Sequence, residues 1–290
     1  METRWLYTAS SDLAALREAS KGVCVIPMGC VEKHGLQLPL GTDILHASAI
    51  TYAASQIETF TVFADYTFGD VPMGSPTAPA GTITLPIELE LKLLMTYCDQ
   101  IARWGYKKIV LYNGHGGNGG LVDLALREWT EEKRDYVLCS VFVDLPALRK
   151  MGETIETQGS GSIPELTRED EEYLVKCYKN KIKGGHACLG EAAHIMGISP
   201  ESVHLDRLGI ESGLSTGVTD YLRDAKIGIM SGGWDINYPN SFSGEDFECN
   251  ERIGKASLRM SAERLAEKIK IIKEDTNIEK WLLDEYQKGW

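Results

Sequence analysis

The chain has 290 residues, of which 43% are hydrophobic and 25% are charged, as in ordinary folded globular proteins. Its 30 basic and 42 acidic side chains give a formal charge of −12, which argues against binding to nucleic acid or to anionic membrane surfaces. We expect no signal peptide, and no apolar run approaches the roughly 18 residues of a membrane span. The seven scattered cysteines form no CxxC pair, which predicts reduced thiols and a cytoplasmic location.

Short apolar runs rich in β-branched residues alternate with segments of helical periodicity in the first half of the chain. We predict strands at 22–27, 61–64, 108–112 and 136–142, and helices at 42–55 and 86–104. Strands that alternate with helices form parallel βαβ units. We therefore expect a single α/β domain over residues 1–290, with three layers (α/β/α) and a mainly parallel sheet. Ligands of such sheets bind beyond the carboxyl ends of the strands, so the loops after Pro27 and Tyr112 are the expected place for chemistry.

Residues from about 145 to 184 interrupt this alternation and are predicted to be an insertion. Because Gln158–Ser162 is flexible in composition, we interpret the insertion as a lid or as an inert surface excursion. An amphipathic helix is predicted at 257–273. The tail after it, with Trp281 and Trp290, carries apolar surface that needs a partner, either this chain's own core or another subunit.

The densest group of chemically active residues follows the first predicted strand, between Gly29 and Asp43. Glu32 and His34 are two residues apart, so in extended backbone their side chains point the same way. Asp43 comes at the start of the next helix, where its carboxylate can face the same loop. Two carboxylates and an imidazole suit Zn, Mn or Fe at neutral pH. The alternative is that Glu32 and His34 form a surface pair and that Asp43 caps the helix.

A second group, Asn113–Asn118, directly follows the third predicted strand. His115 stands between glycines, which allow the backbone to approach whatever the imidazole binds, and Asn118 is predicted to cap the following helix. The competing interpretation is a dinucleotide-binding oxidoreductase. Its glycine pattern would be Gly114, Gly116 and Gly119, with Asp144 at the end of the next strand. That interpretation leaves the first group of residues unexplained.

A third group contains His186 and Glu191, which are little more than one helical turn apart and are expected to flank one pocket at a helix start. With these three groups, the chain resembles the creatininase family, the creatinine amidohydrolase-like enzymes. The resemblance is carried by the G-x-x-E-x-H-G-x-x-L-P-x-G-T-D run at 29–43, by the segments 79–85 and 113–118, by His186 with Glu191, and more weakly by 243–246 with Gly254–Lys255.

The resemblance implies a binuclear metal site of Zn, Mn or Fe ions. Glu32, Asp43 and His115 would hold one ion, while His34 and the shared Asp43 would hold the second. His186 and Glu191 match family positions tied to proton transfer and to the active-site pocket. One departure is Gly117, which replaces a glutamate ligand of creatininase, and Glu191 is our candidate to replace that ligand.

A second departure concerns the substrate. Creatininase places tryptophans just before the position of His186, and residues 173–185 of this chain contain none, so creatinine itself is not expected to be the substrate. His46 and His194 are interpreted as packing residues, and His204 as an ordinary histidine. Cys30 and Cys188 lie close in sequence to proposed site residues, and thiolate is a good zinc ligand. We interpret each instead as a small apolar side chain that fills space. Trp234 and Tyr238 are given no role in a pocket.

The predicted reaction is hydrolysis of a C–N amide bond in a small-molecule amide, a cyclic amide or a formamide. A hydroxide that bridges the two ions would attack the carbonyl, and His186 would deliver a proton to the departing nitrogen. A deformylase or peptidase that uses the same site, and a relative that binds metal without catalysis, remain alternatives to this hydrolase. The resemblance also suggests a homo-oligomer, a hexamer in particular.

Overall fold

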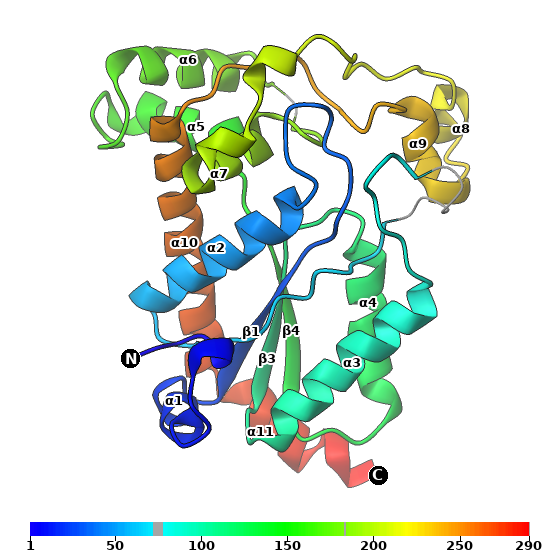
Figure 1. The fold of residues 1–290 in the computed structure, drawn as a ribbon. Coiled ribbons are helices and arrows are strands. Elements are labelled where there is room, and N and C mark those ends of the chain that lie inside the picture. The colour runs from blue at the N-terminus through cyan, green and yellow to red at the C-terminus, as the bar shows by residue number, and fades with distance from the viewer. Residues whose placement is uncertain (72–77, 183, 290) are drawn as a thin grey trace.

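A computed structural model of the chain describes residues 1–71, 78–182 and 184–289 (Figure 1). Four parallel strands form a sheet in the order β2-β1-β3-β4, which confirms the predicted parallel sheet. The strands are β1 (Val23–Met28), β2 (Thr61–Val62), β3 (Lys108–Asn113) and β4 (Val137–Phe142). β2 is shorter than predicted because its pairing with β1 is limited to two residue pairs, Cys24 with Thr61 and Val25 with Val62.

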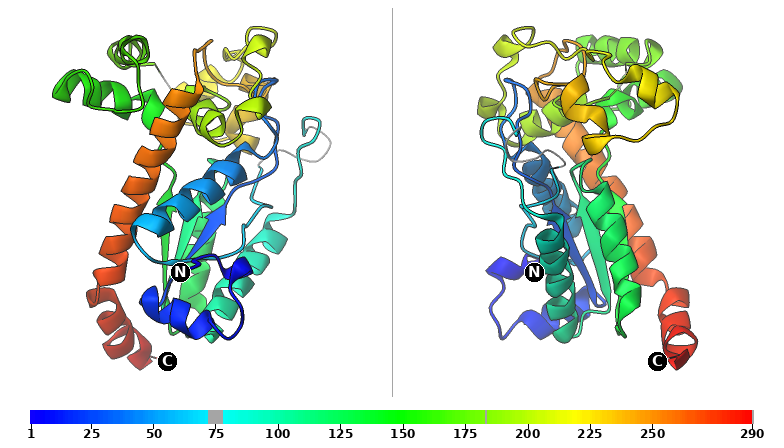
Figure 2. Two further views of the ribbon diagram at one scale, coloured as in Figure 1. Left: turned by 60° about the vertical axis from the view of Figure 1, so that its left-hand side comes forward. Right: turned by 90° about the vertical axis from the view of Figure 1, so that its right-hand side faces the viewer.

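Helices cover both faces of the sheet, so the predicted three-layer architecture is confirmed (Figures 1 and 2). One face carries α2 (Thr42–Ile57) and α10 (Glu251–Glu274), and the other carries α3 (Ile87–Arg103) and α4 (Gly119–Glu128). Successive residues of a strand point to opposite faces. Val23 and Val25 accordingly pack in the core with α2 and α10, and Cys24 packs in the core with α3 and α4.

The helix ends follow local chemistry. Pro86 occupies the N-cap position of α3, and Gly105 follows its end with a φ of +88° that favours glycine. Helix α10 begins six residues before the predicted start. The side chain of Asn250 accepts hydrogen bonds from the backbone N–H groups of Arg252 and Ile253, and this cap extends the helix.

The predicted insertion at 145–184 is a packed helical unit in its described residues, which exclude residue 183. It contains α5 (Lys150–Gln158) and α6 (Arg168–Lys179), which share a buried apolar cluster with α10 and with α7 (Leu189–Ile198). Asp170 of α6 also accepts a hydrogen bond of 2.7 Å from Arg252 of α10. This unit lies beyond the carboxyl ends of the strands, at the top of Figure 1.

The remaining short helices are α1 (Leu13–Ala19), α8 (Asp220–Asp224), α9 (Trp234–Asn237) and α11 (Asn277–Asp284). Short 3-10 helices lie at Trp5–Tyr7, Trp129–Glu131, Pro146–Leu148, Pro200–Ser202, Leu205–Arg207, Met230–Gly233 and Tyr286–Gly289. Among the described residues, no helix has the length and apolar character needed to cross a membrane.

The C-terminal tail packs in part on its own chain. Leu282 of α11 is buried, and the ring of Trp281 lies 5.2 Å from that of Tyr286, which in turn stacks on Trp129 at 5.5 Å. Trp281 is still 51% exposed, and Trp290 lies outside the described residues. A second subunit as a further partner of the tail therefore stays a prediction.

Candidate metal centre

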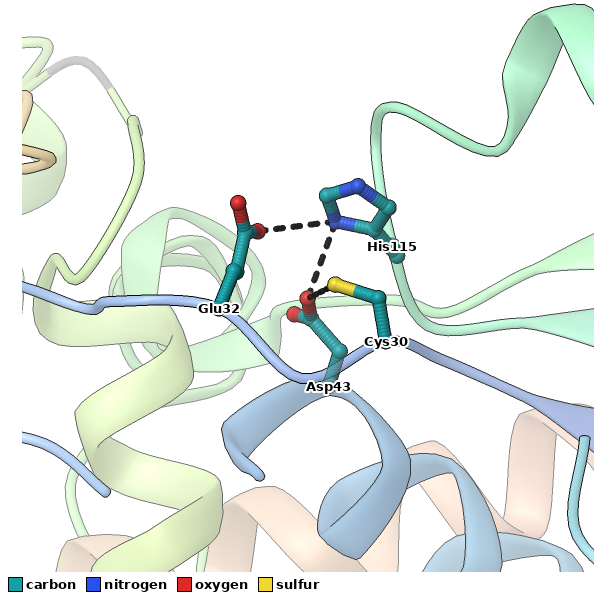
Figure 3. A group of neighbouring side chains, drawn as sticks. All are labelled: Cys30, Glu32, Asp43 and His115. Carbon is teal, nitrogen blue, oxygen red and sulfur yellow. Dashed lines mark hydrogen bonds and ion pairs between the residues drawn. The ribbon is translucent and has the colours of Figure 1, made fainter. Parts of the chain in front are cut away.

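The first two groups of predicted site residues meet at the carboxyl ends of β1 and β3 (Figure 3). Glu32 lies in the loop after β1, His115 is the second residue after β3, and Asp43 is the second residue of α2. Glycines allow these segments to touch. A Cβ on Gly29 would lie 2.4 Å from the backbone nitrogen of Ile44, and one on Gly114 would lie 2.5 Å from the carbonyl oxygen of Asp43. Both loops therefore press against the first turn of α2.

The carboxylate of Asp43 faces two groups of side chains at once. Its Oδ2 lies 2.9 Å from His115 Nδ1, and Glu32 Oε1 lies 3.0 Å from the same nitrogen. Its Oδ1 lies 3.3 Å from His34 Nε2. The relative exposure of all four side chains is 6% or less. The geometry thus has the form expected of two adjacent metal positions that share one carboxylate, although the assignment of ligands stays a prediction.

Three histidines of the site are oriented by backbone carbonyl groups. Each ring nitrogen that faces a carbonyl oxygen must carry a hydrogen, because a carbonyl can only accept, so the other nitrogen is the one that can present a lone pair to an ion. The contacts are His115 Nε2 to Asp70 at 3.0 Å, His34 Nδ1 to Glu32 at 3.2 Å and His186 Nε2 to Lys33 at 2.8 Å. This is the arrangement that metal-ligating histidines adopt.

Two buried polar atoms of this site have no hydrogen-bond partner among the described residues: Glu32 Oε1 and His34 Nε2. A buried polar atom without a partner costs about 1–3 kcal/mol. A divalent cation would satisfy both atoms, and carboxylates with imidazoles are a suitable donor set for Zn, Mn or Fe. The residues present therefore fit a metal site.

The electrostatics keep the carboxylates ionised. Burial opposes protonation of His34 and His115, but the neighbouring carboxylates outweigh it, raising the pKa of His34 to about 10 and that of His115 well above its usual value, so both rings are protonated while no ion is bound. Burial alone would raise the pKa of Asp43, but these facing rings outweigh it and hold that pKa well below its usual value. Burial likewise opposes ionisation of Glu32, while His115 and His186 lower its pKa. Both side chains are thus negatively charged acceptors at neutral pH, as a cation site requires.

The third predicted group, His186 and Glu191, also lies against the side chains of the first group. The ring of His186 stacks on that of His34 at 4.0 Å, and its Nδ1 lies 3.6 Å from Glu32 Oε1. Burial and the neighbouring His34 lower the pKa of His186 to about 4. Glu191 is in the first turn of α7, and its Oε2 lies 4.0 Å from His34 Nε2 and accepts a hydrogen bond of 2.5 Å from the Ala187 backbone.

Ligand atoms of the candidate residues converge in three overlapping groups in the described part of the chain. Each group consists of atoms within 4.8 Å of one another, and the groups are Cys30–Glu32–Asp43–His115, Glu32–His34–His186 and His34–Asp43–Glu191. The structure thus brings together every residue that the sequence predicted for the metal and catalytic roles. Glu191 lies beside His34 and Asp43, and its role as a replacement for a ligand at the position of Gly117 stays a prediction.

A cavity of about 350 Å³ opens above these residues. Its described lining consists of Glu32, His115, Gly116, Gly117, Gly185, His186, Glu191 and Trp234. No residue of 145–182 is among them, so the structure places the described part of the insertion away from the lining, and a lid function stays a prediction.

Sequence reasoning considered two further residues here, Trp234 and Cys30, and gave neither a role in the site. The ring of Trp234 meets that of His186 edge-on at 5.7 Å and lies 4.5 Å from that of Tyr238. The thiol of Cys30 is buried and donates to Asp43 Oδ2 at 3.1 Å. An aromatic pair in a glycine-rich stretch and a cysteine two residues before a candidate ligand were the available signals.

The other histidines and the second cysteine near the site form internal contacts. His46 Nε2 contacts the carbonyl of Gly114 at 3.0 Å, and His194 Nε2 contacts Ser261 Oγ at 3.0 Å. The thiol of Cys188 donates to the carbonyl of Gly185 at 3.1 Å. None of the three belongs to a metal-ligand group among the described residues.

The prediction that the side chain of Asn118 caps α4 was wrong. Asn118 occupies the N-cap position, but its side chain accepts a hydrogen bond from the Asp70 backbone at 2.7 Å and donates to Asn113 Oδ1 at 3.0 Å. It therefore holds the segment whose carbonyl orients His115.

The first glycine of the dinucleotide pattern faces protein atoms and not open space. Gly114 is packed against Asp43 and against the ring of His46, at 2.5 and 2.7 Å from an added Cβ. The carboxylate of Asp144 pairs with Lys268 at 3.1 Å instead of facing this loop. The loop instead directs His115 at Asp43.

A family model described as creatinine amidohydrolase matches residues 7–269. The mycofactocin precursor peptide peptidase of Mycobacterium tuberculosis is 34% identical over 131 residues, covering 40% of this chain and 49% of that protein. The protein of the same name from Mycolicibacterium smegmatis is 33% identical over 128 residues, with the same two shares. The chain therefore matches about half the length of these curated relatives.

Solved structures with the same fold cover nearly the whole chain. A creatinine amidohydrolase (creatininase) structure is 17% identical, covers 94% of this chain and 99% of its own, and has a TM-score of 0.67. A manganese form of creatininase has a TM-score of 0.69 at 17% identity, covering 95% of this chain and 100% of its own. A putative creatinine amidohydrolase from Bacteroides fragilis has a TM-score of 0.64 at 18% identity, with coverage of 96% and 99%. At these identities the likeness establishes the fold.

Proposed function

Because this chain belongs to the creatininase family of hydrolases, we propose that it is a metal-dependent amidohydrolase that cleaves a C–N amide bond in a small cyclic amide or a formamide. The observation that carries this proposal is the pair of metal-ligand groups that share Asp43 at the base of the cavity. Such paired positions suit hydrolytic chemistry.

The residues present divide between two metal positions. Glu32, Asp43 and His115 hold the first ion, and His34, Asp43 and Glu191 hold the second. Divalent ions there supply the Lewis acidity that activates water and polarises a carbonyl. We propose two ions of Zn, Mn or Fe. Solved structures of creatininase that include a manganese form and a Zn–Zn form support the first two choices.

His186 moves the proton in the proposed reaction. Its Nε2–H donates to the Lys33 carbonyl, which fixes the ring and leaves the Nδ1 lone pair free. Since its pKa lies below neutrality, the ring is ready to accept a proton from the attacking water at Nδ1. The same atom then gives the proton to the departing nitrogen, as a general base that becomes a general acid.

The cavity supports a small substrate. Its volume of about 350 Å³ is at the lower end of the range of roughly 300–1,000 Å³ for small-molecule sites. Trp234 offers an aromatic surface beside His186, on which a flat ring could pack. A planar cyclic amide matches both features.

Peptide hydrolysis is the second candidate. It is favoured by the two relatives described above, which are named as peptidases and share 34% and 33% identity with this chain over less than half of its length. A peptidase would use the same metal ligands and the same proton path, and would differ in the substrate that the cavity admits.

A substrate panel separates these candidates. The purified protein, loaded with Zn or Mn, is incubated with cyclic amides, N-formyl compounds and short peptides, and products are identified by mass spectrometry. We expect cleavage of a cyclic amide or a formamide, and none by an Asp43→Asn control. Cleavage of peptides alone would establish the second candidate. Full metal occupancy without turnover on any compound would favour the non-catalytic relative and contradict the proposal.

We further propose that the chain works in the cytoplasm as a homo-oligomer, with a hexamer as the specific expectation. Large apolar side chains that are exposed in the single chain support assembly, and those of one segment are Ile210, Leu214, Val218, Tyr221, Ile227 and Met230. Sedimentation velocity measures the size directly, and a monomer at micromolar concentration would contradict assembly.

A further inference from the structure

Cys30 differs from the other cysteines near the sheet in what its sulfur faces. Its side chain has no exposed surface, and its Sγ lies 3.1 Å from Asp43 Oδ2, the oxygen that also faces His115 (Figure 3). Cys24 and Cys98, by contrast, are buried in the apolar core between the sheet and α3. Packing in the apolar core explains the positions of Cys24 and Cys98. It does not explain why the sulfur of Cys30 faces a carboxylate.

The backbone fixes this position. Gly29 presses against the start of α2, so Cys30 and Asp43 are held on facing segments. Apart from its polar neighbours, Cys30 packs against the apolar side chains of Val71 and Trp234. Cys30 thus lies against apolar side chains and beside the candidate metal position.

An independent observation at the same place points to a cation. Glu32 Oε1 is buried, faces His115 Nδ1 at 3.0 Å and has no hydrogen-bond donor among the described residues. Because His115 Nε2 contacts the Asp70 carbonyl, Nδ1 is the ring nitrogen that can face an ion together with this oxygen. Cys30 Sγ belongs to this same group of atoms within 4.8 Å.

We propose that Cys30 Sγ is a fourth protein ligand of the first metal position, together with Glu32, Asp43 and His115. The inference rests on the proposed function, because it assumes a metal ion at this position. One sulfur, one nitrogen and two oxygens make a donor set that favours Zn, Co(II) or Fe(II) over Mn and Mg, since thiolate is a soft ligand. Cys30 would therefore determine which metal the first position prefers.

Metal binding then has a defined proton balance. Without metal, the thiol keeps its proton and donates it to Asp43 Oδ2. When the metal–sulfur bond forms, the S–H bond breaks and the proton leaves to solvent, while Asp43 Oδ2 turns from the thiol to the ion. The Nδ1 proton of His115 leaves in the same way when that nitrogen binds the ion. No oxidant or reductant takes part.

X-ray absorption at the zinc edge and the optical spectrum of the Co(II)-substituted protein test this assignment on the full chain. We expect a sulfur scatterer at about 2.3 Å from zinc. We also expect a thiolate-to-cobalt charge-transfer band, which Cys30→Ser and Cys30→Ala lose. Cys188→Ser is the matched control, because Cys188 is also buried near the cavity but lies outside the ligand group, and it keeps the band.

Competition between metals gives a second readout. The preference of the wild-type protein for Zn over Mn, measured by equilibrium dialysis against both ions, should fall at least about tenfold in Cys30→Ser. Thermal unfolding of the variants checks that they fold. Bound zinc with nitrogen and oxygen scatterers alone, together with an unchanged preference in Cys30→Ser, would overturn this inference and leave the proposed function standing. A wild-type protein that binds no divalent metal would overturn both.

Discussion

The base of the cavity and its aromatic wall are built in different ways. The base draws its residues from the ends of β1 and β3 and from the first turns of α2 and α7, and its metal-facing side chains are buried. The wall comes from a segment around 205–247 that contains short helical turns, and it contributes Trp234. Regular elements thus fix the chemistry, and the irregular segment shapes the space above it, a division common in α/β enzymes.

Several contacts join the two regions, and two of them involve direct sequence neighbours of site residues. Lys33, next to Glu32, forms an ion pair of 2.7 Å with Glu211 of the wall segment. Gly185, next to His186, lies so close to Ser243 that an added Cβ would be 1.9 Å from its carbonyl oxygen. Substitutions in the base should therefore lower the hydrolysis rate, and substitutions in the wall should alter substrate binding. Substitutions at the joint between the two regions, formed by the contacts Lys33–Glu211 and Gly185–Ser243, should do both.

Removal of metal should have the largest effect. Dialysis against a chelator should lower the hydrolysis rate by at least about a thousandfold, since metal ions supply several kcal/mol of stabilisation to such reactions. Addition of Zn or Mn should restore the rate. The rate on the substrate identified in the panel measures this, and full activity in metal-free protein would mean that the base does not work as proposed.

His186→Ala should lower the rate by about 100- to 10,000-fold while the metal content stays unchanged, because His186 is proposed to move a proton and not to hold an ion. Rate and metal content are measured on the same sample. His204→Ala is the control, since His204 is not among the described residues that line the cavity. If His186→Ala loses its metal, the division of roles is wrong and His186 is a ligand.

Gly185→Ala should disturb the joint between the two regions. The clash with Ser243 forces a backbone shift beside His186, which should cost about 1–3 kcal/mol of unfolding free energy and lower the rate as well. Gly116→Ala is the matched control, because Gly116 also lines the cavity but an added Cβ there meets no atom within 4 Å. Denaturant unfolding compares the free energies of unfolding of the two variants. Equal values would show that the Ser243 backbone shifts at little cost, and would contradict this prediction.

Trp234→Ala should have the smallest effect on chemistry. Loss of the aromatic surface should raise KM about tenfold, which corresponds to about 1.4 kcal/mol, with kcat changed by less than about threefold. Trp234→Phe should keep most of the binding. Steady-state kinetics separates the constants, and a collapse of kcat with an unchanged KM would place Trp234 in the chemistry and remove the contrast between wall and base.

The same contrast explains what the sequence could predict. Glu32, His34, Asp43 and His115 were found because each lies close to a strand or helix end that local periodicity locates. Trp234 was given no role because its place at the cavity is set by contacts with His186 and Cys30, which are distant in sequence.

The predictions for Cys30 and Asn118 left out their main polar contacts for another reason. Both were assigned the most frequent role of their residue type, filler for the cysteine and helix cap for the asparagine. Their actual partners, Asp43 and the backbone of Asp70, come from other segments of the chain. Residue type and local position do not carry that information, whereas the packed structure does.

Elemental analysis of the purified protein, with Asp43→Asn alongside, tests the central claim most directly. Since Asp43 is shared by both positions, the account predicts about two equivalents of Zn, Mn or Fe in the wild-type protein and a loss of metal from both positions in the variant. No metal in the wild-type protein, or the same content in Asp43→Asn, would contradict a binuclear site built around this carboxylate.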